Sequence, residues 1–145
     1  MTAYLLDTNC FIQLVRQRPE APQVQMLLQG IPPAKLYMTD FTLHSIGVIM
    51  NRFGQVAGYS AFLTGLGIGS GFGVAHVEVS ELNRVSSSCT KLGLDFDDAY
   101  QYAAAELRGL TLVSLDTDFD RTPRGRLTPA AALQQFTDEQ KQRIS

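Results

Sequence analysis

Short apolar runs alternate with segments of helical spacing along the whole chain, and this alternation limits the folds open to it. The β-prone runs lie at positions 3–6, 35–38, 75–79 and 110–115. Between them, apolar residues recur at three- and four-residue intervals, the spacing of an amphipathic helix. Such alternation is typical of a parallel sheet covered by helices. We therefore expect an α/β fold: a three-layer sandwich with a mainly parallel central sheet of four to five strands.

Turn and capping residues predict where the other elements begin and end. One helix is expected at 20–29, another after Ser80, and a third is capped by Asp97 or Asp98 and ended by Gly109. Residues 126–128 are the candidate fifth strand. The glycine-rich stretch 58–73 matches no phosphate-binding loop, so we expect a flexible connection there.

Length and composition indicate one globular domain, residues 1–145. Hydrophobic residues make up 45% of the chain and charged residues 18%, which argues against a disordered chain. The formal net charge of −2 excludes a basic coat over the whole molecule. Because no apolar run approaches the roughly 20 residues of a membrane helix, we expect no membrane association. The start of the chain does not resemble a signal peptide, and the two cysteines are too few for a disulfide scaffold, so we expect a cytoplasmic protein.

The acidic residues are concentrated near the predicted strand ends. Asp7 ends the first β-prone run, Asp116 follows the fourth, and Asp98 lies at the start of the helix before the fourth. In parallel sheets, ligands bind at the carboxyl ends of the strands. If the first and fourth strands are neighbours, these acids share one edge of the sheet. Half of the 14 acidic residues lie between 95 and 120: Asp95, Asp97, Asp98, Glu106, Asp116, Asp118 and Asp120.

Carboxylates gathered at one edge must be protonated, paired or bound to a cation, because like charges repel. Mg²⁺ and Mn²⁺ prefer oxygen ligands and would suit such a group. Each aspartate taken alone is better explained by a structural role as a helix cap. Only the joint placement favours a metal site.

Three ordered motifs resemble the PIN-domain family. They are Tyr4-Leu5-Leu6-Asp7-Thr8-Asn9, Leu94-Asp95-Phe96-Asp97-Asp98-Ala99-Tyr100, and Leu112-Val113-Ser114-Leu115-Asp116-Thr117-Asp118-Phe119-Asp120. The resemblance implies an Mg²⁺- or Mn²⁺-dependent ribonuclease, similar to the single-domain VapC-like toxins that pair with an antitoxin. RNA would be the substrate and an antitoxin-like protein the partner, and we also expect a homodimer.

The resemblance also implies roles for individual residues. Asp7, Asp98 and Asp116 would be metal ligands, and Asp118 an auxiliary acid. Three further residues would orient those carboxylates through hydrogen bonds: Thr8, Asn9 and Ser114.

One position departs from the family pattern. Where the family has a glutamate early in the helix after the second strand, this chain has Ser45. Asp40 is more than a helical turn too early to replace it, and His44 would project about 100° away around the helix. We interpret His44 as a capping or exposed residue. The missing charge predicts reduced activity, and it leaves open a catalytically degenerate module that binds RNA or a protein.

Arg121, Arg124 and Arg126 follow the last acidic motif closely and could bind RNA phosphates. The alternative is a solvated loop whose arginines pair with Asp118 and Asp120. The other cationic residues considered are scattered in sequence and carry no signal: Arg16, Arg18, Lys35 and Arg52.

Two other aspartate-based families fit poorly. A response-regulator receiver needs an acidic pair after the first strand and a lysine after the last, and the chain has neither. A haloacid-dehalogenase phosphatase needs a second aspartate at the position of Asn9.

Overall fold

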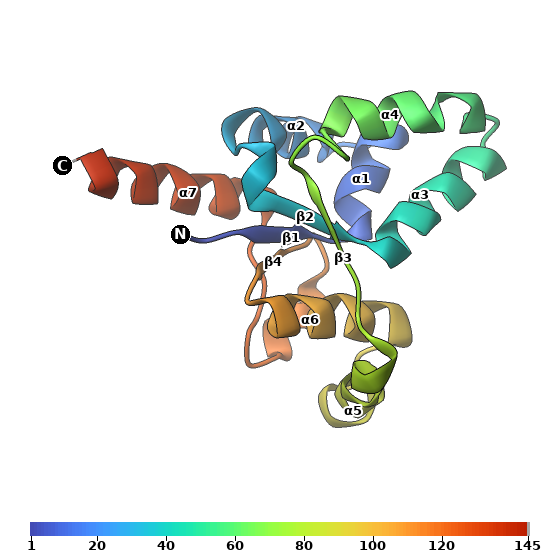
Figure 1. Ribbon diagram of the computed structural model, residues 1–145, viewed down its shortest axis with the longest axis vertical. Helices are drawn as coiled ribbons and strands as arrows, with labels where there is room; N and C mark the ends of the chain where they lie inside the picture. Colours follow the sequence, from blue (N-terminus) through green and yellow to red (C-terminus); the bar gives the residue numbers. More distant parts are fainter. Residues whose placement is uncertain (145) are drawn as a thin grey trace.

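A parallel sheet of four short strands forms the middle layer of the protein. The structure, a computed structural model, describes residues 1–144. The strands are β1 (Tyr4–Leu6), β2 (Leu36–Thr39), β3 (Gly73–Ala75) and β4 (Thr111–Val113), in the spatial order β3-β2-β1-β4 (Figure 1). All three neighbouring pairs are parallel. The expected α/β fold is therefore confirmed.

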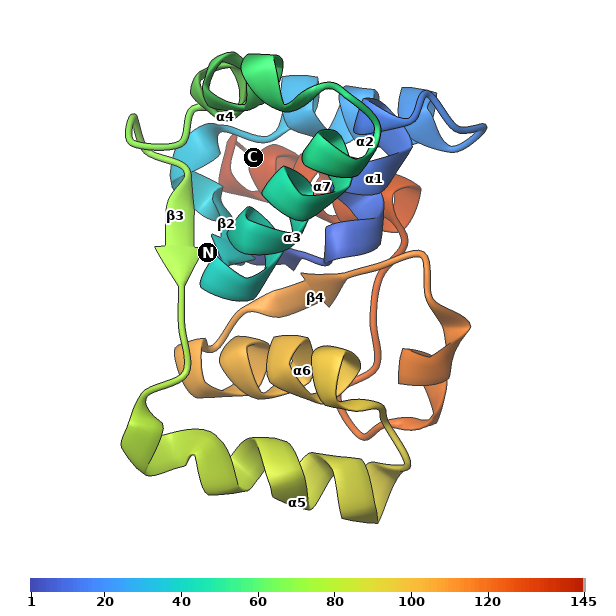
Figure 2. The same cartoon turned by 90° about the vertical axis from the view of Figure 1, so that its right-hand side faces the viewer.

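Helices cover both faces of this sheet. Figures 1 and 2 show α5 and α6 on one side of it, with the other helices on the opposite side. The helices are α1 (Thr8–Val15), α2 (Ala21–Gly30), α3 (Asp40–Arg52), α4 (Tyr59–Leu66), α5 (Leu82–Leu92), α6 (Phe96–Arg108) and α7 (Pro129–Ile144). Short 3-10 turns lie at Pro33–Lys35, Val56–Gly58, Val79–Glu81 and Thr117–Arg121.

The central strand β1 connects two hydrophobic cores. Tyr4 and Leu6 belong to the core under α1, α2 and α7, whereas Leu5 belongs to the core under α5 and α6. Successive side chains of a strand point to opposite faces, so a strand between two helical layers must be apolar throughout. This explains why β1 reads as a continuous apolar run.

The pairing of β1 with β4 brings two distant acidic motifs to one edge of the sheet. Leu6 lies beside Val113 in the register, and the Asp7 amide donates to the carbonyl of Val113 over 2.9 Å. The condition set by the sequence, that the first and fourth strands be neighbours, is therefore met.

The predicted third strand is displaced from the observed one. Residues 75–79 were expected to pair, but β3 covers Gly73–Ala75 and Val79 begins a 3-10 turn. The physical reason is the partner strand. β3 pairs only with β2, whose last residue, Thr39, lies opposite Ala75, and beyond Thr39 the chain turns into α3. Residues after Ala75 therefore have no strand to pair with.

The other differences concern element ends. The candidate fifth strand reduces to a single bridge between Leu127 and Val113. Ser80 does not cap a helix, because it lies within a 3-10 turn and α5 begins at Leu82.

The glycine-rich stretch is more ordered than expected. Its first half forms α4, which the Tyr59 hydroxyl anchors by donating to the carbonyl of Leu43 on α3. After α4 the chain reverses at Gly67, where φ is 92°. Only glycine adopts such φ values without strain. The expectation of a flexible connection is wrong for the helical half of the stretch.

Candidate metal centre

Asp7 is held in a buried position at the carboxyl end of β1. It caps α1, and its side chain is only 5% exposed. One carboxylate oxygen, Oδ1, accepts from the amide of Thr8 at 2.8 Å and from Nε2 of Gln101 at 3.1 Å. The other, Oδ2, accepts from the Ser114 hydroxyl at 2.7 Å. Burial raises the pKa of Asp7, and these hydrogen bonds oppose that rise.

Asp98 lies in the first turn of α6, one residue further into the helix than Asp97. The helix is capped by Asp95, whose Oδ1 accepts from the Asp98 amide at 2.9 Å, so neither Asp97 nor Asp98 is the cap that the sequence predicted. Partial burial raises the pKa of Asp98 to about 7, with further contributions from Asp7, Asp95 and Asp116. Asp98 therefore sits in a field of negative charge.

Asp116 and Asp118 complete the acidic group from the turn after β4. The amide of Asp116 donates to the Ser114 hydroxyl at 3.0 Å, and the amide of Asp118 donates to the Asp116 carboxylate at 2.8 Å. Single carboxylate oxygens of Asp98, Asp116 and Asp118 all lie within 4.8 Å of one another. We call these three residues together with Asp7 the acid centre.

Ser114 links the two motifs that supply the acid centre. Its hydroxyl donates to Asp7, accepts from the Asp116 amide, and accepts from Nδ2 of Asn9 at 3.1 Å. Asn9 in turn accepts from the amide of Leu115 at 3.3 Å. Ser114 thus contacts Asp7 directly, and Asn9 holds Ser114 and the backbone beside Asp116.

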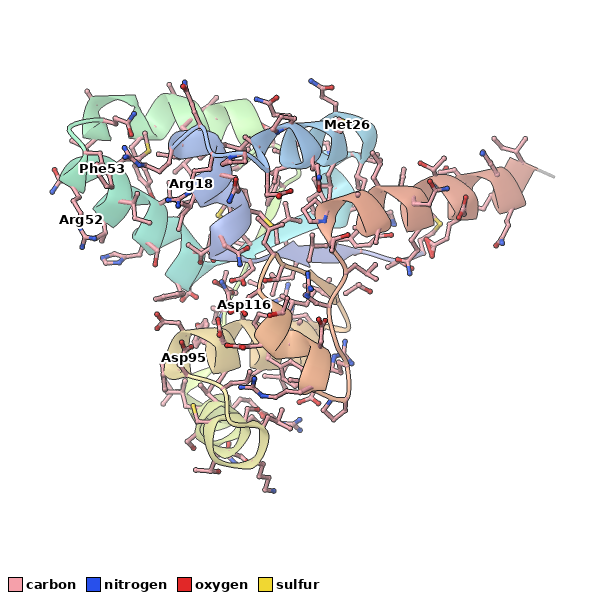
Figure 3. The ribbon with its side chains drawn as sticks, turned by 180° about the vertical axis from the view of Figure 1, so that it is seen from behind. Arg18, Met26, Arg52, Phe53, Asp95 and Asp116 are labelled. Atoms are coloured by element: carbon pink, nitrogen blue, oxygen red, sulfur yellow. The ribbon has the colours of Figure 1, made fainter. Side chains whose placement is uncertain are left out.

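The acid centre opens into a cavity of about 360 Å³, which we call the acid cavity. Figure 3 labels two residues of its wall, Asp95 at the N-terminus of α6 and Asp116 in the turn after β4. The helices α1 and α3 supply much of the remaining wall. The lining residues are Asp7, Thr8, Asn9, Ile12, Phe41, Ser45, Ile49, Asp95, Asp97, Asp98 and Asp116.

Ser45 lies on the wall of the acid cavity, on the same helix as Phe41 and Ile49. His44 does not line this cavity and lies instead on neighbouring surfaces, in accordance with its projection away from Ser45. Asp40 is exposed and also lies outside it. That Ser45 occupies the position of a family glutamate stays a prediction.

Gln101 is a site residue that the sequence analysis missed. It is 1% exposed, and its Nε2 also reaches the hydroxyls of Thr8 at 3.1 Å and Thr42 at 2.7 Å. Thr8 therefore contributes through this network and through its amide, while its hydroxyl bonds to no carboxylate among residues 1–144. A sequence signal existed: Gln101 is a polar residue within an apolar stretch, three positions after Asp98 and so on the same helical face.

The loop at 121–126 uses its arginines internally. Arg121 donates to the carbonyls of Leu92 and Gly93, and Arg124 to that of Leu110. Arg126 binds Asp120 through two nitrogens, and Arg121 pairs with Asp118 at 3.3 Å. These contacts favour the structural alternative, and RNA binding by this loop stays a prediction.

A different group of arginines is brought together by the fold. Arg16 and Arg18 follow α1, Arg52 ends α3, and all three are exposed. Figure 3 shows Arg18, Arg52 and Phe53 together at the ends of these helices. The Arg16 guanidinium lies 3.4 Å from the centre of the Phe53 ring. Within residues 1–144, none of the three arginine side chains forms an ion pair or hydrogen bond. Arg16 and Arg52, which are far apart in the sequence, are therefore brought close together through Phe53, and a role for these arginines stays a prediction.

The donor set of the acid centre fits a hard divalent cation. Three carboxylates that come within 4.8 Å of one another offer only oxygen ligands, and Mg²⁺ or Mn²⁺ binds such ligands. Arg121 pairs with Asp118 at 3.3 Å, but among residues 1–144 no lysine, arginine or histidine lines the acid cavity to balance the charge of Asp98 and Asp116. The pKa of Asp98 is raised first by burial and then by the neighbouring negative charges of Asp7, Asp95 and Asp116, and a bound cation would oppose both effects.

Comparison with known proteins places this geometry in context. A family model described as PIN domain matches residues 4–125. No curated protein sequence matches the chain. No helix of residues 1–144 has the length and apolar character to cross a membrane.

Three solved structures share the fold. A toxin-antitoxin complex from Klebsiella pneumoniae contains a chain with a TM-score of 0.70 and 23% identity, covering 88% of this chain and 98% of its own. A protein from Pyrobaculum aerophilum gives a TM-score of 0.65 with 21% identity, covering 94% and 98%. FitAcB from Neisseria gonorrhoeae gives 0.66 with 20% identity, covering 87% and 97%. At these identities the likeness concerns the fold alone.

Proposed function

The chain belongs to the PIN-domain family, and from this premise we propose that it is a metal-dependent ribonuclease that hydrolyses RNA at the acid centre. The observation that carries the proposal is the convergence of Asp98, Asp116 and Asp118, with Asp7 lining the same cavity. Asp7, Asp98 and Asp116 would hold the cation, as the family resemblance implies, with Asp118 beside them. A divalent ion there would lower the pKa of a bound water and stabilise negative charge on the phosphate.

The residues around the acid centre support its chemistry by keeping the carboxylates in place. Ser114 holds Asp7 and the Asp116 backbone, and Gln101 holds Asp7 from the opposite helical layer. Fixed carboxylates lose little freedom when they bind a cation. In their deprotonated state, Asp98 or Asp118 can accept the proton of an attacking water.

RNA phosphates need positive charge close to this acidic cavity. Arg16 and Arg52 are the candidates, because they extend the two helices that line it. Thr8 and Arg16 are separated by about two helical turns, or roughly 12 Å. Guanidinium groups without acidic partners remain available for phosphate oxygens.

Ser45 favours a second candidate, a degenerate module that binds RNA or protein without cleaving it. The Ser45 hydroxyl on the cavity wall offers a cation no negative charge, so the acid centre should bind a cation more weakly than a centre with an additional glutamate. The solved structure from Klebsiella pneumoniae that shares this fold is a toxin-antitoxin complex. By analogy we propose an antitoxin-like partner for this chain, and a homodimer as its assembly.

The experiment is RNA cleavage by the purified chain with Mn²⁺ or Mg²⁺, with chelator as the comparison. We expect cleavage only with the ion, and at least about a tenfold loss in Asp98→Asn, which removes one charged ligand. Asp138→Asn on α7, whose carboxylate bonds only to Gln134 among residues 1–144, is the matched control and should cleave as wild type does.

Calorimetry with Mn²⁺ separates the two candidates. Mn²⁺ binding without cleavage, together with retained RNA binding, would favour the degenerate module. Cleavage that persists in chelator or in Asp98→Asn would contradict the metal-dependent mechanism.

A further inference from the structure

A second cavity, also of about 360 Å³, adjoins the acid cavity. It lies between the N-terminal turns of α3 and α6, and Phe41 and Asp97 line both cavities. We call it the aromatic pocket. Its lining residues are Asp40, Phe41, His44, Phe96, Asp97 and Tyr100.

Ring-bearing side chains dominate the walls of the aromatic pocket. Phe41 and Tyr100 form a tilted pair with ring centres 6.3 Å apart. Phe96 is 59% exposed at the start of α6, although it is a large apolar residue. An exposed aromatic ring beside an open cavity is available for stacking against a planar group.

The polar groups of the pocket are mainly hydrogen-bond acceptors. One oxygen of Asp40 accepts from the Tyr100 hydroxyl at 2.8 Å, which leaves the other oxygen open. Within residues 1–144, the Asp97 carboxylate has no hydrogen bond or ion pair. Among residues 1–144 no lysine or arginine lines the pocket, so it suits a ligand group with N–H donors and disfavours a phosphate.

We propose that the aromatic pocket binds a base of the substrate RNA, with guanine preferred, next to the phosphate at the acid centre. This rests on the proposed ribonuclease function. Stacking on Phe96 or Phe41 accommodates any base, whereas the carboxylates select among them. Guanine presents two adjacent N–H donors on its Watson–Crick edge, which one carboxylate accepts together. Because the two cavities share Phe41 and Asp97, a base in one pocket belongs to a nucleotide beside the other.

The test is the sequence preference of cleavage, read by sequencing the products of a randomised RNA incubated with Mn²⁺. Wild type should show guanine enriched at one fixed position relative to the cut. Asp97→Asn should lose that enrichment and move toward adenine, because an asparagine amide pairs with adenine. Phe96→Ala should weaken RNA binding about 5- to 150-fold, the loss of one stacked base. Asp138→Asn should keep the wild-type preference.

Two measurements guard against indirect effects. Thermal melting establishes that the variants fold, and Mn²⁺ titration establishes that Asp97→Asn keeps its ion affinity. A base preference unchanged in both Asp97→Asn and Phe96→Ala would overturn the pocket proposal while leaving the ribonuclease intact.

Binding of guanosine monophosphate in chelator tests the pocket without catalysis. Amide shifts in the NMR spectrum should concentrate at Phe96, Asp97 and Tyr100, and should be weaker with uridine monophosphate. Such shifts without any RNA cleavage would support the pocket and contradict the proposed function. Equal shifts with all nucleotides would overturn the proposal. It would also be overturned if no nucleotide caused shifts and a basic peptide did.

Discussion

At the scale of single residues, the hydrogen bonds of Asp7 explain how the protein keeps a nearly buried carboxylate that pairs with no basic side chain among residues 1–144. Its acceptors are satisfied by Thr8, Gln101 and Ser114. A buried charge without hydrogen bonds is strongly unfavourable, so each donor matters to the folded state as well as to the site.

Removing the Gln101 amide should therefore destabilise the fold. Gln101→Leu has similar volume but cannot donate to Asp7, and we expect it to lower the free energy of unfolding by about 1–3 kcal/mol. Urea unfolding in chelator measures this difference. Gln134→Leu on the exposed side of α7 is the control and should change stability by less than about 0.5 kcal/mol. A loss no larger than that control would mean that Gln101 does not support Asp7.

Ser45→Glu tests the departure from the family pattern. The new carboxylate would join the acidic wall of the cavity, so the variant should melt below wild type in chelator. With Mn²⁺ it should gain more thermal stability than wild type, because the ion acquires an anionic ligand and binds only the folded state. Differential scanning calorimetry records the crossover. Equal responses to Mn²⁺ would show that Ser45 does not stand at the vacant acidic position.

At the scale of elements, two aspartates at the N-terminus of α6 have different roles. Asp95 caps the helix, which leaves Asp98 free to face the acid cavity. The sequence offers several aspartates for these roles, and only the backbone geometry decides which one caps.

Replacing Asp95 separates its capping from its charge. Asp95→Ala should cost about 0.5–2 kcal/mol of stability, whereas Asp95→Asn keeps a capping oxygen and should cost much less. Both should lower the pKa of Asp98, because the Asp95 charge helps to raise it. Chemical denaturation measures the first effect, and NMR titration of the Asp98 carboxyl measures the second. An unchanged Asp98 pKa in both variants would mean that the charge of Asp95 does not act on Asp98.

At the scale of the whole molecule, the acid centre makes stability depend on pH and on the ion together. Burial raises the pKa of Asp7, and the pKa of Asp98 rises from 3.8 to about 7. The folded, ion-free protein therefore binds protons that the unfolded chain has released between these values. Where the native state binds more protons, stability falls as pH rises.

We accordingly expect the ion-free protein to melt lower at about pH 8 than at about pH 5, with Asp98→Asn reducing this difference. With saturating Mn²⁺ the trend should reverse, because the ion competes with the proton and binds more tightly as pH rises. Melting curves in chelator and in Mn²⁺ measure both trends. A melting temperature independent of pH and of Mn²⁺ would contradict the coupling.

Local patterns in the sequence determined the strand–helix alternation, the parallel sheet, the family and the position of Asp7 and Asp116 at strand ends. The family match confirms the resemblance. These features were predictable because periodicity and strand-end position depend on residues close together in the chain. The prediction of the third strand was wrong for the opposite reason, since the length of this strand depends on where its partner β2 ends.

Only the tertiary structure decided that Gln101 joins Thr8, Asn9 and Ser114 around the acid centre, and how these residues are bonded to one another. Gln101 reaches Asp7 across 94 positions of sequence, and Asn9 reaches Ser114 across 105. It likewise decided that Arg121, Arg124 and Arg126 bond internally, whereas among residues 1–144 the Arg16 and Arg52 side chains form no ion pair or hydrogen bond and Arg16 stacks on Phe53. A hydrogen bond or ion pair depends on distances between side chains, and the packing of helices on the sheet sets those distances, whereas separation along the chain does not.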